Sequence, residues 1–246
     1  MNIVIPMAGL GSRFSHCGFT LPKPLIKVAQ KPMYRHAVDC LPLHLASKLI
    51  FILRDNEFVK QLSNDIEAHY GFLLNCSIVV LEHDTAGQAE TFLASERHLD
   101  INEPTLIHNC DTYFKENFTW TSLLAKDVDG AIVLFKSQEC RWSYVSLDET
   151  HMKVIEIEEK KVISTNASTG TYFFKDTAGL LATIRQLIAH DVRENNEYYL
   201  STVYKDMLKR GQHIIPLWTK TMMCFGTPQD LVDSLNNMLL NSRVLS

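Results

Sequence analysis

The sequence lacks the features that mark secreted, membrane-bound and nucleic-acid-binding proteins. Its six cysteines stand singly, with no Cys-x-x-Cys and no Cys/His group at zinc spacing, which favours reduced thiols and predicts a cytoplasmic protein. The N-terminus has no basic region followed by a long apolar core, so we expect no signal peptide. No apolar run approaches membrane-spanning length. The net charge of −4 gives no reason to expect nucleic acid or a membrane surface as a partner.

Two common nucleotide-binding signatures are also missing. Gly9 and Gly11 follow the apolar run 2–5, which predicts a buried strand and then a tight turn. A Rossmann dinucleotide site would have a third glycine at position 14, where Phe14 stands. The Gly-Lys-Ser/Thr of a P-loop is absent as well. A lone Gly-x-Gly of this kind is most often only a turn.

The turn and the residues after it are nonetheless suited to a polyphosphate. Gly9 and Gly11 allow backbone N–H groups to approach a bulky anion closely. Arg13 supplies a planar, permanently charged group for phosphate oxygens. Lys23 stands between two prolines, which hold its backbone extended and restrict where it can point.

The hydrophobic pattern predicts one α/β domain. In the first half, four apolar strands alternate with helices, which is typical of a parallel sheet covered on both faces. After residue 130, strands follow one another with little helix between them, which indicates a mixed or antiparallel extension. No linker, repeat or low-complexity segment divides the chain. We therefore expect residues 1–246 to form a single domain, with a nucleotide-binding half at about 1–130 and an acceptor-binding half at about 131–246. The predicted strands are 2–5, 49–53, 77–81, 105–108, 131–135, 144–147, 154–157 and 170–174, with late strands at 214–215 and 222–223; the predicted helices are 31–41, one starting after 55–56 and running to about 70, 87–99, 178–190, 198–210 and 228–240.

The strings Pro6-Met-Ala-Gly-Leu-Gly-Ser-Arg-Phe14 and Leu21-Pro-Lys-Pro-Leu25 resemble the signature of the sugar-phosphate nucleotidyltransferases, or nucleoside-diphosphate-sugar pyrophosphorylases. They are most similar to the branch found in bacterial capsule-biosynthesis clusters. The resemblance implies a Rossmann-like, mixed but mainly parallel sheet flanked by helices (a GT-A-like nucleotidyltransferase fold) with a smaller antiparallel extension. It also implies that the loop and the lysine grip a nucleoside triphosphate, through Ala8, Gly9, Gly11, Ser12, Arg13 and Lys23.

A second segment, His83-Asp-Thr-Ala-Gly-Gln-Ala89, is predicted to read the base. Small residues at a strand-to-helix turn let the backbone lie against a base, and Gln88 offers a donor and an acceptor. Ordinary helix-capping turns look similar, and Thr85 is a candidate cap. The segment resembles the family's base-reading loop, which implies nucleotide contacts for Thr85, Gly87 and Gln88; Thr85 replaces the loop's leading glycine.

Asp111 ends the fourth predicted strand in Asn-Cys-Asp, where a carboxylate could hold Mg²⁺ or cap a turn. The resemblance implies that Asp111 is the family's metal-binding Asp, with Mg²⁺ or Mn²⁺ as the cofactor. The pattern usually supplies a second Asp before Gly-Thr, but Cys224 stands there, and a thiol is a poor ligand for Mg²⁺. Asp-x-Asp, expected of a glycosyltransferase of similar fold, is absent: Asp111 is followed by Thr and Tyr.

Three segments of the second half have both an ordinary and a functional interpretation. Glu159 and Lys160 could belong to a solvated strand end, Gly170 to a simple strand start, and Glu197 to a helix start where its charge suits the dipole. The same segments resemble the family's Glu-Lys-Pro, Gly-x-Tyr and acceptor-hydroxyl motifs, with Lys161 in place of the proline. The resemblance implies that Lys160, Gly170 and Glu197 bind the acceptor.

The reaction implied is attack of an acceptor phosphate, such as that of a sugar 1-phosphate, on a nucleoside triphosphate, with pyrophosphate released. Arg13, Lys23 and Asp111 would be the catalytic residues. Two alternatives remain: a cytidylyltransferase acting on a non-sugar phosphate such as phosphocholine or a phosphorylated amino acid, and a nucleotide-binding protein without catalysis. The sequence is compatible with a homo-oligomer.

Overall fold

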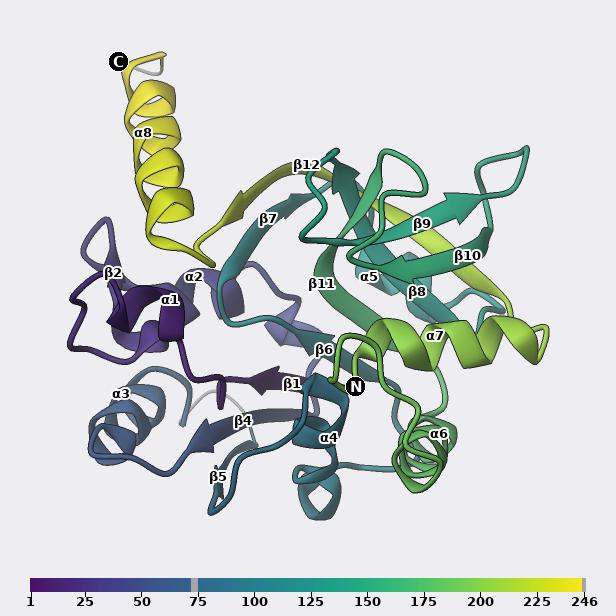
Figure 1. The fold of residues 1–246 in the computed structure, drawn as a ribbon, viewed down its shortest axis with the longest axis horizontal. Helices are drawn as coiled ribbons and strands as arrows, with labels where there is room; N and C mark the ends of the chain where they lie inside the picture. Colours follow the sequence, from purple (N-terminus) through teal and green to yellow (C-terminus); the bar gives the residue numbers. More distant parts are fainter. Residues whose placement is uncertain (72–74, 245–246) are drawn as a thin grey trace.

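A computed structural model describes residues 1–71 and 75–244, with side chains through residue 240. Its centre is a ten-stranded sheet in the order β5-β4-β1-β6-β11-β8-β12-β7, with β9 and β10 joined at its side (Figure 1). A separate hairpin pairs β2 with β3. The strands are β1 Asn2–Pro6, β2 Lys27–Val28, β3 Lys31–Pro32, β4 Lys48–Arg54, β5 Cys76–Leu81, β6 Thr105–His108, β7 Thr112–Glu116, β8 Gly130–Lys136, β9 Ser143–Leu147, β10 Val154–Glu159, β11 Asn166–Phe174 and β12 Ile214–Cys224. The predicted fold class, a mixed sheet flanked by helices with an antiparallel extension, is confirmed.

The parallel part of the sheet contains the strands predicted from the first half of the sequence. β1 pairs in parallel with β4 and with β6, and β4 pairs in parallel with β5. The chain therefore runs outward from β1 to β5 and then returns to the other side of β1. At such a reversal the loops after adjacent strands separate, and ligands bind there, beyond the carboxyl ends.

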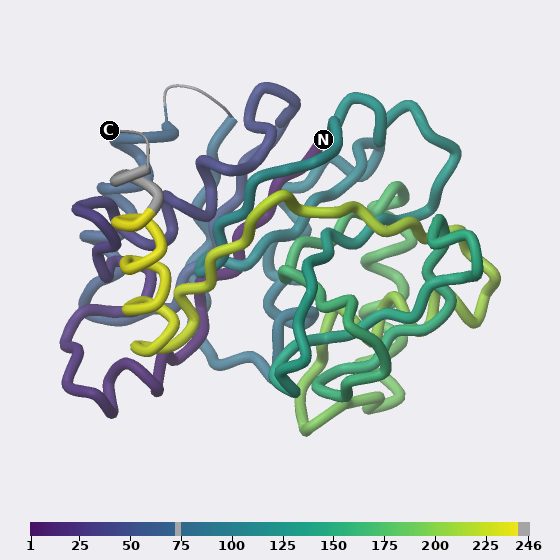
Figure 2. The backbone as a smooth tube through the Cα atoms, turned by 90° about the horizontal axis from the view of Figure 1, so that it is seen from above, coloured from purple at the N-terminus to yellow at the C-terminus, as the bar shows by residue number. Residues whose placement is uncertain are grey.

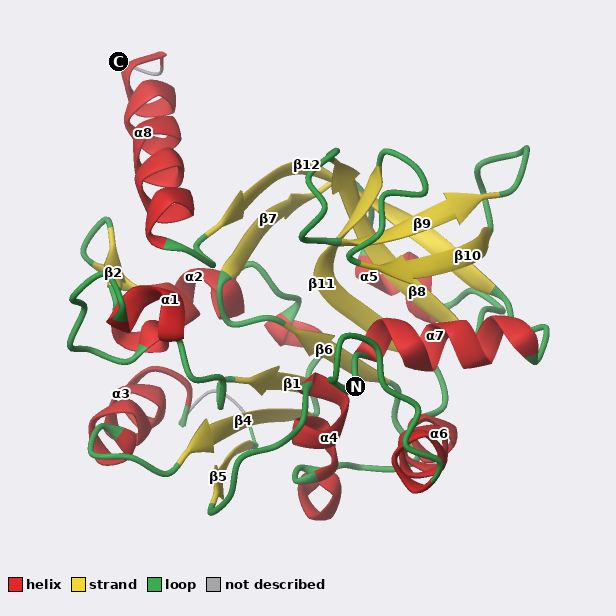
Figure 3. Cartoon of the chain, in the orientation of Figure 1, coloured by secondary structure: helices red, strands yellow, loops and turns green. Residues whose placement is uncertain are grey.

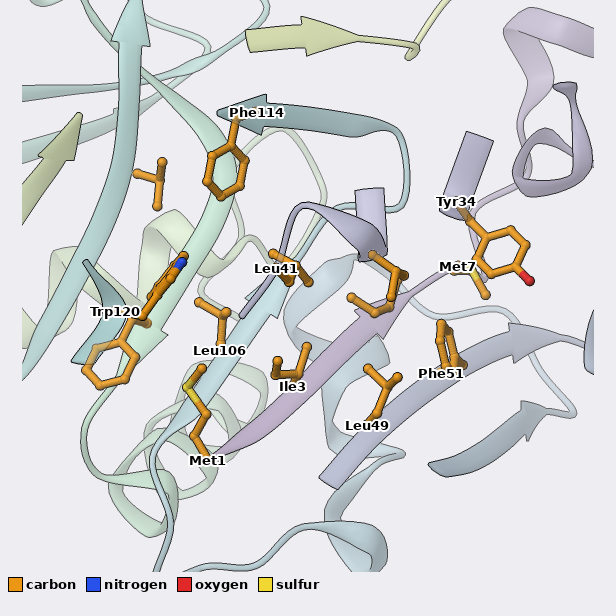
Figure 4. Close-up of a cluster of buried hydrophobic side chains, with 14 of the residues drawn as sticks. Met1, Ile3, Met7, Tyr34, Leu41, Leu49, Phe51, Leu106, Phe114 and Trp120 are labelled. Atoms are coloured by element: carbon orange, nitrogen blue, oxygen red, sulfur yellow. The ribbon is translucent and has the colours of Figure 1, made fainter. Parts of the chain in front are cut away.

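The apolar runs are long because the strands are buried on both faces. Ile3 and Ile5 pack into one hydrophobic cluster and the intervening Val4 into another, as the alternation of side chains along a strand requires. Figure 4 shows Ile3, Leu49 and Phe51 in the first cluster together with Tyr34 and Leu41.

Figure 3 shows the helices arranged around the strands. They are α1 Ser12–Ser15, α2 Met33–Asp39, α3 Val59–Tyr70, α4 Gln88–Leu93, α5 Trp120–Leu124, α6 Thr177–Ala189, α7 Leu200–Lys209 and α8 Pro228–Val244, with short 3-10 turns at Lys23–Leu25, Leu43–Leu45 and Glu96–His98.

The two late strands predicted at 214–215 and 222–223 are one continuous strand, β12. Its first part pairs in parallel with β8 and its second part antiparallel with β7, a strand that the sequence pattern did not reveal. Figure 2 shows β12 crossing the molecule and leading to α8 (yellow), which lies next to the N-terminal segments (purple). There Phe225 and Leu231 pack with Phe14, so the C-terminal part of the chain contacts α1.

Three local predictions need correction. The helix predicted from 31 begins at Met33, because residues 31–32 pair with β2. The helix predicted over 87–99 is α4 followed by a 3-10 turn. Thr85 does not cap α4: its hydroxyl bonds the Thr91 hydroxyl at 2.5 Å, and Gly87 holds the cap position. Within the part of the chain that the structure describes, no helix is both long and apolar enough to cross a membrane.

Candidate functional site

A cavity of about 760 Å³ opens where the loops after β1, β5 and β6 meet the second half of the chain. Every residue predicted for the site contributes to its lining, which brings together segments from both halves of the sequence. The roles of these residues stay predictions, but their proximity is a property of the fold. The predicted residues in the lining are Ala8, Gly9, Gly11, Ser12, Arg13, Lys23, Thr85, Gly87, Gln88, Asp111, Lys160, Gly170 and Glu197.

The turn after β1 depends on Gly11. Its φ of 64° lies in the left-handed region, and a Cβ there would stand 3.2 Å from the Lys23 Cβ. Gly11 therefore lets Lys23 approach the loop closely. Arg13 follows in the short helix α1, exposed, and forms no ion pair with another described residue.

The Lys23 ammonium group forms an ion pair with Oδ2 of Asp111, inside the cavity. The two side chains are only 19% and 17% exposed. Burial alone would lower the pKa of Lys23, but the Asp111 carboxylate outweighs it and raises that pKa. Burial would raise the pKa of Asp111, and the Lys23 charge instead holds it below its usual value. Both groups are therefore charged at neutral pH.

The candidate base-reading turn is held by the opposite half of the protein. The backbone N–H of Tyr198 donates to the Ala86 carbonyl at 2.7 Å, and the N–H of Ala89 donates to the Tyr198 carbonyl at 2.9 Å. Gly87 lies between them with φ 132°, and a Cβ there would come within 2.6 Å of the Tyr198 backbone. Gln88 is oriented by its amide, which donates to Oδ1 of Asn109 at 2.6 Å. Glycine at 87 is thus required by close backbone contact.

In the second half of the chain, Gly170 approaches Asn109 so closely that a Cβ would overlap the Asn109 side chain. Glu159 accepts hydrogen bonds from Ser143 at 2.5 Å and from Ser201 at 2.7 Å. Its burial raises the pKa of the carboxyl above its usual value, although the two hydroxyls oppose this. Lys160, exposed and with φ 54°, donates to the Tyr199 hydroxyl at 2.5 Å.

The cavity also contains residues that the sequence analysis did not single out. Arg141 bonds Glu139 at 2.6 Å and Asp230 at 2.7 Å, and its guanidinium lies 4.4 Å from the centre of the Trp142 ring. Asn109 joins Gln88 to Gly170, as described above. Arg141 belongs to no motif, and Asn109 begins the Asn-Cys-Asp segment without a predicted role, so only the folded chain reveals what these two residues contact.

Cys224 lies beside the predicted metal residue. The nearest atoms to a Cβ built on Gly226 are the Cys224 sulfur at 3.1 Å, Oδ2 of Asp111 at 3.3 Å and Oδ2 of Asp230 at 3.5 Å. Burial raises the pKa of the Cys224 thiol well above its usual value, so it is protonated. Among the described residues, no three His, Cys, Asp or Glu side chains form a metal site by themselves. Carboxylates around this space nonetheless fit Mg²⁺, which takes one or two carboxylates together with substrate phosphates.

The cavity beyond the carboxyl ends of the parallel strands, the glycine turn and the buried Lys–Asp pair define an α/β protein whose site suits a phosphate-rich ligand. A comparison with family models makes this specific: residues 3–239 match the model described as nucleotidyl transferase. The chain belongs to the nucleotidyl transferase family, a family of enzymes, as its motifs predicted.

The chain is also similar to individual proteins of known structure or activity. The solved nucleoside-diphosphate-sugar pyrophosphorylase from Vibrio cholerae is 27% identical, with a TM-score of 0.84 over 95% of this chain and 99% of that one. A UDP-glucose pyrophosphorylase structure, at 17% identity and a TM-score of 0.77 over 98% of each chain, shares the fold. The mannose-1-phosphate guanyltransferase of Gibberella zeae is 26% identical over 71% of this chain and 49% of its own length. The chain spans about a third to a half of the curated relatives it matches.

Proposed function

We propose that this protein joins a nucleoside triphosphate to an acceptor phosphate monoester, a sugar 1-phosphate in the first instance, and releases pyrophosphate. The observation that carries the proposal is the single cavity in which the loop after β1 and the Lys23–Asp111 pair face the acceptor-side residues Lys160 and Gly170. Similarity to the Vibrio cholerae pyrophosphorylase over nearly the whole of both chains supports it.

The chemistry requires little beyond positioning and charge neutralisation. An oxygen of the acceptor phosphate attacks the α-phosphorus and forms a new P–O bond. The bond between the α-phosphorus and the α–β bridging oxygen breaks, and its electron pair leaves with pyrophosphate. The acceptor is already an anion, so no side chain has to act as a general base.

Each predicted residue has a definite part in this scheme. Arg13 holds the β- and γ-phosphates that leave, and Lys23 neutralises charge that builds on the α-phosphate. Lys160 steers the acceptor phosphate. Asp111 holds Mg²⁺, which when bound supplies further neutralisation of the phosphate oxygens. The turn at Gly87 and Gln88 receives the base.

Pyrophosphate release tests the proposal. The five common nucleoside triphosphates would be combined with mannose 1-phosphate, glucose 1-phosphate, phosphocholine and phosphoserine, with Mg²⁺ present. We expect release with one nucleotide and a sugar 1-phosphate. Release only with a non-sugar phosphate would instead support the cytidylyltransferase alternative. Nucleotide binding without release for any pair would support a non-catalytic protein. A place in the synthesis of bacterial surface polysaccharide, in the cytoplasm, would follow from the first outcome and stays a prediction.

A further inference from the structure

The space beside Gly226 is bounded by two carboxylates that come from distant parts of the chain. Asp111 follows β6, and Asp230 lies in the first turn of α8. Their Oδ2 atoms are 3.3 and 3.5 Å from the point where Gly226 would carry a Cβ. A side chain at residue 226 would therefore press against both carboxylates, and glycine avoids this.

The backbone fixes this arrangement. The N–H of Phe225 donates to the Asp111 carbonyl at 2.7 Å, so the two segments are joined directly. The N–H of Asp230 donates to the Thr227 hydroxyl at 3.1 Å, and Ser234 bonds the Cys224 carbonyl at 2.8 Å. These contacts orient the first turn of α8 so that the Asp230 side chain faces inward, with only 11% of it exposed.

Each carboxylate has one positively charged partner. Asp111 pairs with Lys23, and Asp230 pairs with Arg141 at 2.7 Å. Both cations line the cavity, where a triphosphate would compete for them. Cys224 lies in the same space, but a neutral thiol offers a hard cation little.

We propose that Asp230, rather than Cys224, supplies the second protein carboxylate beside Asp111 for the divalent cation. The inference rests on the proposed function only for the choice of Mg²⁺ or Mn²⁺ as that cation. Without cation and nucleotide, Lys23 and Arg141 neutralise the two carboxylates. When the cation takes the carboxylates, these two side chains are released toward phosphate oxygens. The cation thus gains oxygen ligands that position 224 does not provide.

Asp230 has a competing structural interpretation, because a carboxylate in the first turn of a helix is favourable in itself and the Arg141 pair adds to it. The two interpretations differ in what Arg141 does. If Asp230 serves only the structure, replacing Arg141 and replacing Asp230 should change Mn²⁺ binding equally, because each replacement breaks the same ion pair. If Asp230 binds the cation, removing Arg141 leaves a freer ligand.

Direct metal binding distinguishes the two. Free Mn²⁺ would be followed by electron paramagnetic resonance during titration of the purified chain, alone and with inorganic pyrophosphate. We expect Asp230→Asn to weaken Mn²⁺ binding by about tenfold or more, and Asp111→Asn to do the same. Asp233→Asn, an exposed carboxylate of the same helix, and Cys224→Ser should bind as the unaltered protein does, and Arg141→Gln should bind no more weakly.

The melting temperature of each variant shows whether it is folded. If Asp230→Asn unfolds because Arg141 loses its partner, the double variant Asp230→Asn/Arg141→Gln removes both charges. This double variant should be folded and should bind Mn²⁺ more weakly than the unaltered protein does. The proposal would be overturned if a folded Asp230→Asn protein bound Mn²⁺ as tightly as the unaltered protein does. Equal weakening in Arg141→Gln, or no Mn²⁺ binding by the unaltered protein, would overturn it as well. None of these readouts depends on turnover, so they can fail independently of the proposed reaction.

Discussion

Lys23 and Asp111 form a largely buried ion pair although 88 positions separate them in the sequence. Lys23 is mounted between Pro22 and Pro24 and faces the space left by Gly11. The pair holds an ammonium group beside the loop that follows β1 and keeps both groups charged. A triphosphate bound as proposed would therefore have to compete with Asp111 for this ammonium group.

Replacing Lys23 by Ala should lower kcat by about 10²–10³ while nucleotide affinity changes little, because α-phosphate charge builds in the transition state. The measurement is steady-state pyrophosphate release together with calorimetric nucleotide binding. Lys27→Ala, an exposed lysine in β2, is the matched control and should leave both values unchanged. A change confined to KM would make Lys23 a binding residue.

Asp111→Ala should nearly abolish turnover, and so should excess EDTA, because the carboxylate would hold the cation that neutralises the phosphate oxygens. Removing one partner of a buried pair is also destabilising, so the variant should melt at a lower temperature. Asp111→Asn preserves the shape and tests the charge alone. Undiminished activity in a folded variant, or in EDTA, would contradict the metal assignment.

Gly87→Ala should destabilise the protein by about 1–3 kcal/mol or more, since the residue has a left-handed φ and its Cβ would strike the Tyr198 backbone. Gly9→Ala is the control for folding, because a Cβ there meets no atom within 4 Å and its φ is not left-handed. Chemical denaturation of both variants measures the difference. Equal stability of the two would show that the turn can move away from Tyr198.

Cys224→Asp should lower the concentration of Mg²⁺ that gives half-maximal activity, because it adds an oxygen ligand beside Asp111. Titrating Mg²⁺ against rate checks this, with a melting curve for each protein. An unchanged midpoint in a folded variant would show that position 224 does not contribute to the cation site.

Glu159→Gln should change the pH dependence of stability. Burial raises the pKa of Glu159, so its contribution to stability is present below the usual value of 4.5 and is lost as pH rises through the higher folded value. Glutamine keeps an oxygen for Ser143 and Ser201 but does not titrate. The variant should therefore gain stability relative to the unaltered protein as pH rises above 4.5. Unfolding measured on both sides of that pH checks this, and a difference independent of pH would argue against the raised pKa.

The sequence by itself determined the buried strands and the residues at their ends. Runs such as 2–5 and 49–53 must be covered on both faces, and Gly11, Lys23 and Asp111 follow strands whose carboxyl ends meet at one edge of a sheet. Those local rules are enough to predict the fold class and to gather the candidate residues at one edge.

Only the tertiary structure decided how the two halves meet. The sequence pattern revealed neither the continuity of β12 nor its partner β7, yet β12 brings Asp230 back to Asp111. The pairing of Arg141 with Asp230 spans 89 positions, and the contact of Gly87 with Tyr198 joins opposite halves. Such contacts depend on where distant segments arrive in space, and no local spacing of residues records that.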